Sequence, residues 1–188
     1  MIQSVPVEIA SEVEKALKGF KSLKKENIQF KLKKSLNGSV MMAQPRFLDI
    51  FKKREERRYL VLVSKTFTIA KTTFATSKLP SEVKIGWFAH ELGHIMDYQK
   101  LSTQKLLRFG FLYLFSRSFM RKAELRADTY AVKAGYGTYL IRTKNFILSH
   151  TELPESYKNK IRKYYPSPDQ ILEIDRDLRK VSEIDQEP

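Results

Sequence analysis

The pentapeptide His90-Glu91-Leu92-Gly93-His94 determines how the rest of this chain is interpreted. Successive residues of a helix are turned by about 100°, so His90 and His94 lie on one face and can bind the same metal ion. Glu91 lies beside that face and can reach a water molecule on the metal without being a ligand. The spacing therefore predicts two metal ligands and a general base on one helix.

A third ligand is required, because a catalytic zinc site takes three protein ligands and leaves one position for water or substrate. The chain has no cysteine and its only other histidine is His150, so a carboxylate is expected. Glu124 and Asp128 are one helical turn apart, in a segment with Ser118 at an N-cap position and Gly135 at a stop position. One of these carboxylates can bind metal while the other accepts the outward N–H of a ligand histidine.

The motifs together resemble those of the gluzincin metallopeptidases. The resemblance is carried by His90-Glu91-Leu92-Gly93-His94, by Glu124-Leu125-Arg126-Ala127-Asp128 and by Gly135-Tyr136-Gly137. It points to the soluble minimal gluzincins and to the catalytic core of the CAAX prenyl protease type. A zincin-like fold is implied, with the first motif on the active-site helix.

The same resemblance implies a role for each motif residue. In such enzymes, the two histidines and the glutamate of the second helix bind one zinc ion. Carried over to this chain, the metal ligands are His90, His94 and Glu124. Glu91 is then the catalytic base, and Asp128 supports the ligands from behind. The implied activity is hydrolysis of peptide bonds in a peptide or protein substrate.

Each motif also has a simpler interpretation. Surface helices often carry histidine and glutamate at this spacing, and two acids one turn apart usually mark a solvated helix face. Both motifs lie in helices with apolar periodicity and in the order that zincins use, which favours a zinc metalloendopeptidase. The alternative is a non-catalytic, zinc-stabilised protein whose basic surface binds membrane or nucleic acid.

Length and composition suit a single domain. At 188 residues and 42% hydrophobic content, the chain can bury one core but is short for two domains. The predicted parts are a helix and sheet region at 1–78, metal-binding helices at 79–135 and C-terminal helices at 136–188. The absence of cysteine fits a reducing compartment, and no secretory signal or membrane span is predicted. A cytoplasmic protein, peripheral to the membrane at most, is expected.

Hydrophobic periodicity predicts sheet first and helices afterwards, which is an α+β fold. The expected strands are 27–33 and 40–43, joined as a hairpin through Asn37-Gly38, followed by 58–63 and 72–76. The expected helices are 7–23, 45–53, 83–98, 118–134, 138–149, 154–165 and one from 167. The strand at 72–76 directly precedes the motif helix, so it is expected to lie along the cleft and pair with an extended substrate.

A transition-state stabiliser is the least determined part of the predicted site. Such enzymes can use a histidine or tyrosine to stabilise the oxyanion that forms when water attacks the carbonyl. The candidates are His150, Tyr130, Tyr136, Tyr164 and Tyr165. His150 can equally be a helix C-terminal partner, and most tyrosines simply pack in the core.

The strongly positive net charge is the second notable feature of the chain. The formal charge is +14, although residues 169–188 carry seven acids against three bases. Such a body favours anionic partners, but its basic residues are scattered, which argues against a nucleic-acid motif. The apolar segment 106–120 is predicted to be a wall of the core or pocket, with an anionic membrane surface as the alternative.

The acidic last helix allows two predictions. It is either an ordinary closing helix that buries Ile171, Ile174, Leu178 and Val181, or a cover over the cleft that makes the enzyme latent. The sequence predicts no oligomeric state.

Overall fold

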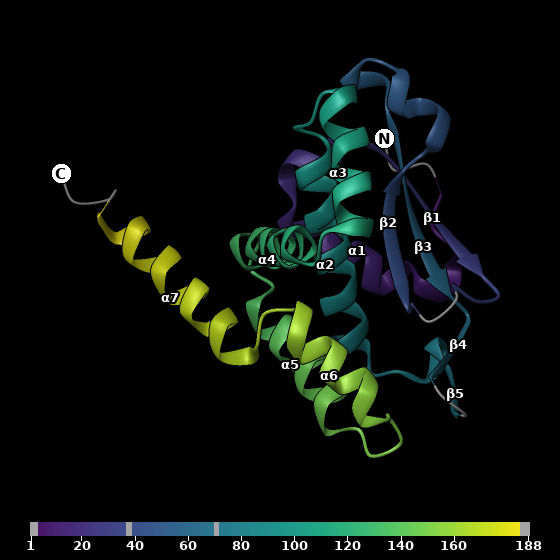
Figure 1. Cartoon of the computed structure of the whole chain (residues 1–188), viewed down its shortest axis with the longest axis vertical. Helices are drawn as coiled ribbons and strands as arrows, with labels where there is room; N and C mark the ends of the chain where they lie inside the picture. Colours follow the sequence, from purple (N-terminus) through teal and green to yellow (C-terminus); the bar gives the residue numbers. More distant parts are fainter. Residues whose placement is uncertain (1–3, 37–38, 70–71, 185–188) are drawn as a thin grey trace.

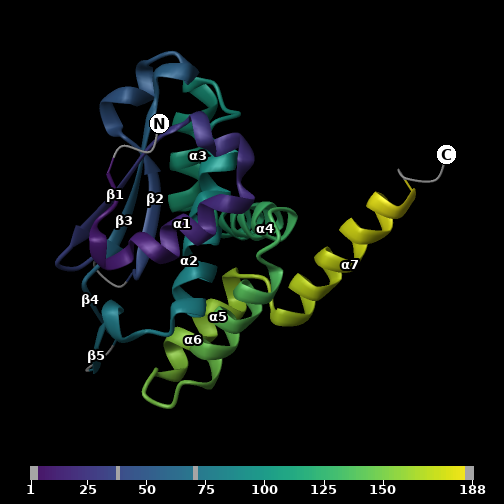
Figure 2. The same ribbon diagram turned by 180° about the vertical axis from the view of Figure 1, so that it is seen from behind.

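The structure, a computed structural model, describes residues 4–36, 39–69 and 72–184 of the chain. A small sheet and its flanking helix come first in the sequence, and an all-helical half follows (Figures 1 and 2). The predicted α+β class, with a small mixed sheet ahead of the helices, is confirmed. One buried apolar cluster includes side chains from Ile9 to Ile171.

The main sheet has three strands in the order β1-β3-β2. β1 (Asn27–Lys33) runs parallel to β3 (Arg58–Ser64), and β2 (Met41–Pro45) runs antiparallel to it. Alternate side chains of β3, at Tyr59 and Val61, are fully buried, as expected for the central strand of a sheet with one covered face. Because β3 is the central strand, β2 is an edge strand of this sheet.

The predicted hairpin between 27–33 and 40–43 is wrong, because β3 lies between these two strands. A single bridge joins Leu36 and Ser39, so the chain reverses there without extending into a two-stranded ladder. Residues 37–38, on which the prediction of a turn rested, lie outside the described residues. The backbone groups on both edges of the apolar strand β3 need hydrogen-bond partners. β1 pairs with one edge and β2 with the other, so these two strands, although close in sequence, are not adjacent in the sheet.

A second, two-stranded antiparallel sheet is formed by β4 (Thr66–Ile69) and β5 (Thr72–Ala75). The predicted strand at 72–76 therefore exists, but its partner β4 was not predicted. The ring of Phe67 stacks on that of Phe74 across the pair, with 5.2 Å between centroids.

The α-helices are α1 (Ala10–Gly19), α2 (Ser81–Tyr98), α3 (Thr103–Phe115), α4 (Arg117–Lys133), α5 (Gly137–Ser149), α6 (Glu155–Tyr164) and α7 (Pro168–Ile184). The 3-10 turns are η1 (Val7–Ile9), η2 (Lys21–Lys25), η3 (Phe47–Phe51), η4 (Arg54–Glu56) and η5 (Thr76–Lys78). Five predicted helices agree with α2, α4, α5, α6 and α7, whereas the predicted helix 7–23 is divided into three pieces and the one at 45–53 is only a 3-10 turn. The helix α3 was not predicted.

Both ends of α4 are set by specific residues. Its N-cap is Ser116, whose hydroxyl accepts a hydrogen bond from the N–H of Phe119, so the predicted cap at Ser118 is wrong by two residues. Gly135 follows the last turn with a φ of +88°, the left-handed conformation that glycine adopts without steric cost. Because Ser116 separates α3 from α4, the apolar segment 106–120 belongs to two helices.

The motif helix α2 is the centre of the molecule and packs on α1, α4, α5 and β2. A Cβ built on Gly93 would lie 2.2 Å from the carbonyl oxygen of Ala127 on α4. Glycine at this position of the motif therefore allows α4 to cross α2 closely, which places the carboxylates of α4 against the histidines.

The last helix extends away from the body in both views (Figures 1 and 2). Ile171 is fully buried against the body, while Val181 is 56% exposed, so the predicted burial of Val181 is wrong. No described residue of α7 lines the cavity at the candidate site. Among the described helices, none has the length and apolar character needed to cross a bilayer.

Candidate metal centre

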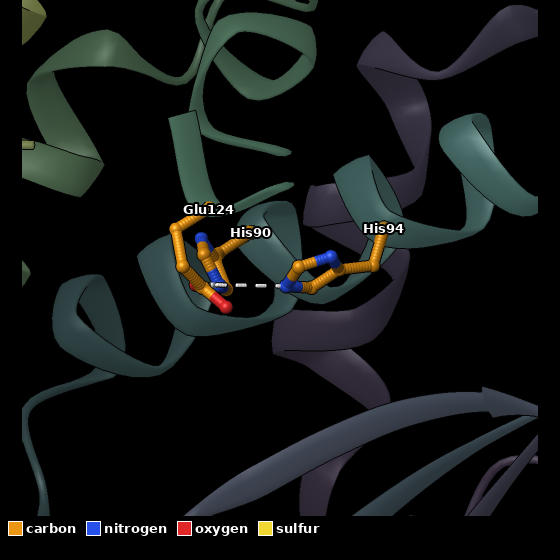
Figure 3. Close-up of side chains that lie close together, drawn as sticks. All are labelled: His90, His94 and Glu124. Atoms are coloured by element: carbon orange, nitrogen blue, oxygen red, sulfur yellow. Dashed lines mark ion pairs between the residues drawn. The ribbon is translucent and has the colours of Figure 1, made fainter. Parts of the chain in front are cut away.

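Two helices place three potential ligands together. His90 and His94 project from α2, and Glu124 projects toward them from α4 (Figure 3). Oε2 of Glu124 lies 3.0 Å from Nε2 of His90 and 3.7 Å from Nε2 of His94. All three side chains are buried, and their ligand atoms lie within 4.8 Å of one another.

The donor set fits a tetrahedral metal ion. Ligand atoms about 2.0–2.1 Å from a tetrahedral ion are separated by roughly 3.3 Å, and the two measured separations lie on either side of that value. Oε2 of Glu124 is buried without a hydrogen-bond partner among the described residues. Its nearest polar neighbours are Nε2 of His90 and Nε2 of His94, and a cation bound by all three atoms would compensate the buried carboxylate, so the residues present suit a metal ion.

Asp128 fixes the orientation of His90 from the opposite side of the ring. Its Oδ1 lies 2.6 Å from Nδ1 of His90, which leaves Nε2 to face Glu124. The other oxygen, Oδ2, lies 3.1 Å from the ammonium of Lys144, which is itself buried. A chain of three buried groups, Lys144, Asp128 and His90, thus supports the ligand cluster.

The electrostatics of the cluster favour positive charge. Burial alone would lower the pKa of His90, but the carboxylates of Asp128 and Glu124 raise it to about 10. Burial would raise the pKa of Glu124, yet the two imidazoles hold it well below its ordinary 4.5. The pKa of Asp128 is lowered too, because Lys144 and His90 outweigh its burial. Glu124 is therefore ionised where the two Nε2 atoms converge, and Asp128 is ionised at the opposite nitrogen of the His90 ring.

Glu91 lies beside the cluster but is not one of its three potential ligands. The backbone N–H of Ala43, on β2, donates a hydrogen bond of 2.6 Å to its Oε2. Burial raises the pKa of Glu91, and the nearby charge of Glu124 adds to that effect, while the two imidazoles and the Ala43 N–H oppose it. A carboxylate with a raised pKa accepts a proton more readily near neutral pH.

Tyr113 on α3 adds a contact to the third ligand. Its hydroxyl donates to Oε1 of Glu124, the oxygen that does not face the histidines. Burial and the charge of Glu124 raise the pKa of Tyr113, which keeps the phenol protonated as a donor. The helix α3, which carries four of the twelve exposed large apolar residues in the described part of the chain, is thus linked directly to the ligand cluster.

The strand beside the metal helix is β2, so the expectation that residues 72–76 lie along the cleft is wrong. Val40 and Arg46 are both hydrogen-bonded to β3, and the antiparallel alternation assigns the N–H and C=O groups of Met41 and Ala43 to the free edge. The N–H of Ala43 donates to the carboxylate of Glu91, and its carbonyl accepts a hydrogen bond of 3.4 Å from the hydroxyl of Tyr98. The backbone of Met41 thus remains for an added strand.

Two cavities share His90 and Glu91 as walls. The larger, of about 440 Å³, extends from Met41–Pro45 on β2 to Leu106–Tyr113 on α3. The smaller, of about 80 Å³, lies toward α5 and α6. A molecule bound at the cluster therefore has room on both sides of it.

Of the predicted transition-state candidates, only Tyr165 lines these cavities. Its ring centroid is 5.9 Å from that of His90, and burial raises its pKa well above the ordinary value. His150 instead packs against the rings of Phe74 and Phe146.

The other tyrosine candidates have structural or surface contacts. Tyr136 donates to the carbonyl of Lys15 and stacks on Phe20. The hydroxyl of Tyr130 accepts a hydrogen bond from Lys100, and the ring of Tyr164 lies beneath the ammonium of Lys163. None of these three lines the two cavities in the described part of the chain.

Three contributors to the site were not predicted: Tyr113, Lys144 and the backbone of Ala43. Lys144 left a usable signal, since it stands between Leu140 and Ile147 on the apolar face of its helix, where an unpaired lysine is costly. Tyr113 and Ala43 gave no comparable signal, because their partners lie 11 and 48 residues away on other elements.

Comparison of the chain with protein-family models, with curated proteins and with solved structures gave no match. The chemical interpretation of the site therefore rests on the sequence motifs and on the geometry of these residues.

Proposed function

We propose that the chain is a zinc-dependent metalloendopeptidase of the gluzincin type. The observation that carries this proposal is the position of Glu91. Its buried carboxylate is fixed by the N–H of Ala43 and adjoins a three-ligand cluster at the wall of a large cavity. A metal site with a purely structural role has no chemical need for a free carboxylate held beside its ligands.

In the proposed reaction, His90, His94 and Glu124 hold the metal. A bound zinc ion would polarise the substrate carbonyl and lower the pKa of a water molecule. Glu91 accepts a proton from the attacking water and passes it to the leaving amine. Asp128 keeps Nε2 of His90 directed at the cluster throughout this cycle.

An extended polypeptide is the substrate class that suits the cleft. The backbone groups of Ala43 at the free edge of β2 are bonded to Glu91 and Tyr98, so those of Met41 remain to bind the backbone of an extended peptide independently of its sequence. The cavities on either side of His90 and Glu91 leave room for residues before and after the cleaved bond, as an endopeptidase requires.

Zinc is the metal that the ligand set favours. Mixed imidazole and carboxylate ligation in tetrahedral geometry is typical of catalytic zinc, although cobalt or manganese can substitute in vitro. The finding at the level of the structure is a buried group of two histidines and one glutamate that can hold a metal ion.

The decisive experiment compares cleavage of an unbiased peptide mixture by the zinc-loaded parent and by Glu91→Gln. This variant removes the base and keeps all three ligands, so it is expected to bind zinc and to cut at least 1,000-fold more slowly, on the order of a catalytic base's contribution. Glu82→Gln is the matched control, because Glu82 is on the same helix but pairs with Arg142 at the surface.

Two outcomes would contradict the proposal. Equal cleavage by the parent and Glu91→Gln would show that the activity comes from another source. Zinc binding without cleavage by any variant would favour the alternative, a metal-stabilised protein that acts by binding.

A further inference from the structure

Exposed apolar side chains are concentrated on α3 and η3. Seven of the twelve large apolar residues exposed in the described part of the chain lie there. We call this set the α3–η3 face; it consists of Phe47, Leu48, Phe51, Leu107, Phe111, Leu114 and Phe115. Phe47, Leu114 and Phe115 are each more than 70% exposed. Soluble proteins rarely expose such a group of large side chains without a partner.

The pattern along α3 is the reverse of an ordinary surface helix. Leu106 and Phe109 point inward and are buried. Residues 107, 111, 114 and 115 share the opposite face, where a surface helix normally carries polar residues. The rings of Phe111 and Phe115 contact each other on that outer face, with centroids 4.8 Å apart. Core packing therefore does not explain the composition of this helix.

The two parts of the face are held together by hydrogen bonds. The hydroxyl of Thr103, in the first turn of α3, donates to the carbonyl of Ile50 in η3 at 2.9 Å. The guanidinium of Arg57 donates to the carbonyl of Leu101 at 2.7 Å and to the hydroxyl of Thr103 at 3.0 Å. η3 thus lies against the start of α3, as Figure 1 shows.

The surroundings of the face are basic. Residues 99–123, which include all of α3 and the first turns of α4, contain six lysines and arginines and no acidic residue. Arg108, Arg117 and Arg121 are exposed. An apolar face bordered by positive charge is complementary to an anionic lipid surface, whose headgroups attract the charges while the acyl boundary accepts the apolar side chains.

The face also reaches the entrance of the candidate site. Leu114, although 74% exposed, is one of the residues that line the 440 Å³ cavity, together with Gly110 and Met42. A surface on which the α3–η3 face rests would therefore lie next to the cavity that leads to His90, Glu91 and His94.

We propose that the α3–η3 face docks on the headgroup region of an anionic lipid bilayer and brings the cavity mouth to that surface. The substrate is then a polypeptide segment at the membrane surface. The second statement rests on the proposed peptidase function, whereas the docking itself does not.

Docking is tested by sedimentation of the zinc-loaded chain with vesicles of phosphatidylcholine alone and with added phosphatidylglycerol. The chain is expected to bind the anionic vesicles at least tenfold more tightly, and more weakly as salt increases. The double variant Phe111→Glu and Phe115→Glu is expected to lose this binding. The matched control, Leu172→Glu and Val181→Glu, adds the same two charges to exposed sites on α7 and is expected to bind like the parent.

Three results would overturn docking: no binding of the parent to anionic vesicles, equal binding to both vesicle types, or unchanged binding of the Phe111 and Phe115 variant. A concentration-dependent dimer that this variant abolishes, in a chain that ignores vesicles, would assign the face to a second copy instead. Circular dichroism verifies that the Phe111 and Phe115 variant is folded. If that variant is unfolded, single substitutions at Leu107 and at Phe47 replace it in the binding test.

The substrate statement is tested with one peptide, either free or joined to a lipid anchor in anionic vesicles. The parent is expected to cut the anchored peptide at least tenfold faster. Phe111→Glu with Phe115→Glu should cut the free peptide normally, since neither residue lines the cavity, and should lose the advantage with the anchored one. Equal rates on both peptides would overturn the statement. If the Glu91→Gln protein binds vesicles and no protein cuts either peptide, the peptidase proposal fails while docking stands.

Discussion

Nδ1 of His90 lies 2.6 Å from Oδ1 of Asp128, and both side chains are buried. Because Asp128 occupies Nδ1, the other ring nitrogen of His90, Nε2, is the one that faces Glu124. Because the contact is made by the second acidic residue of α4, one turn after Glu124, a single helix provides both a ligand and the group that orients another ligand.

Replacing Asp128 with asparagine is therefore expected to weaken zinc binding by about 10- to 100-fold, the usual effect of losing a carboxylate behind a ligand histidine. The measurement is competition for zinc against a chelator of known affinity. Asp97→Asn is the control, since Asp97 is also a buried acid, but it lies on α2 and pairs with Arg126. A loss of similar size in both variants would indicate general destabilisation instead.

Tyr113→Phe removes the hydroxyl that donates to Oε1 of Glu124. The carboxylate then loses one of the contacts that hold it, and we expect zinc affinity to fall by about threefold to tenfold, which corresponds to the roughly 1 kcal/mol of a typical hydrogen bond. Tyr130→Phe, which removes a surface hydroxyl bonded to Lys100, should leave affinity unchanged. Unaltered affinity in Tyr113→Phe would show that Glu124 is held by its backbone and the metal alone.

The residues predicted to form the metal site were those that local spacing can identify. His90 and His94 are four residues apart on one helix, and so are Glu124 and Asp128, so each pair could be placed on a helix face before the fold was known. The structure brings the two pairs together. Their proximity depends on the close crossing of α2 and α4 at Gly93. The pentapeptide sequence alone does not predict which helix crosses there.

What could not be predicted depends on contacts between distant segments. The residues of β2 looked like one arm of a hairpin, because the Asn37-Gly38 signal is local, whereas the choice of β3 as partner depends on the whole sheet. The same error hid the role of Ala43 beside Glu91. An exposed position for the apolar residues of 106–120 was only the alternative prediction, since apolar residues are ordinarily assigned to the core.

Gly93→Ala tests the close helix crossing. The new methyl group would meet the carbonyl oxygen of Ala127, and overpacking of this kind costs about 1–3 kcal/mol of the free energy of unfolding. Zinc affinity should fall as well, because α4 carries Glu124. Gly110→Ala is the control: its methyl group would meet no atom within 4 Å, and alanine stabilises a helix by up to about 1 kcal/mol over glycine. Chemical denaturation of both variants measures the difference.

A buried ion pair between α1 and α2 predicts how stability depends on pH. Burial alone would raise the pKa of Glu12, but the ammonium of Lys84, 2.8 Å away, and the hydroxyl of Ser81 outweigh it, so the pKa lies below its ordinary 4.5. A carboxyl group whose pKa is lowered by folding stabilises the protein above pH 4.5, and this stabilisation is lost as the pH falls through the folded-state pKa.

Glu12→Gln should therefore lower the free energy of unfolding at pH 7, and the difference from the parent should shrink as the pH falls below about 4.5. Denaturation with chelator present in both proteins keeps loss of metal from contributing. Glu14→Gln is the control, because Glu14 is on the same helix but is exposed and pairs with the exposed Lys18. A difference between parent and Glu12→Gln that is constant from pH 7 to pH 3 would exclude this role for the pair.

Tyr165 is the remaining group whose position suggests a part in the proposed hydrolysis. It lines both cavities beside His90, and its raised pKa keeps the phenol protonated at neutral pH, as a hydrogen-bond donor to an oxyanion must be. Tyr165→Phe is expected to lower kcat by about 100-fold, the size of effect seen when one oxyanion donor is removed, with little change in KM or zinc affinity. Tyr164→Phe, which alters the neighbouring ring outside the cavities, should retain full activity. An increase in KM with kcat unchanged would instead assign Tyr165 to substrate binding in the ground state.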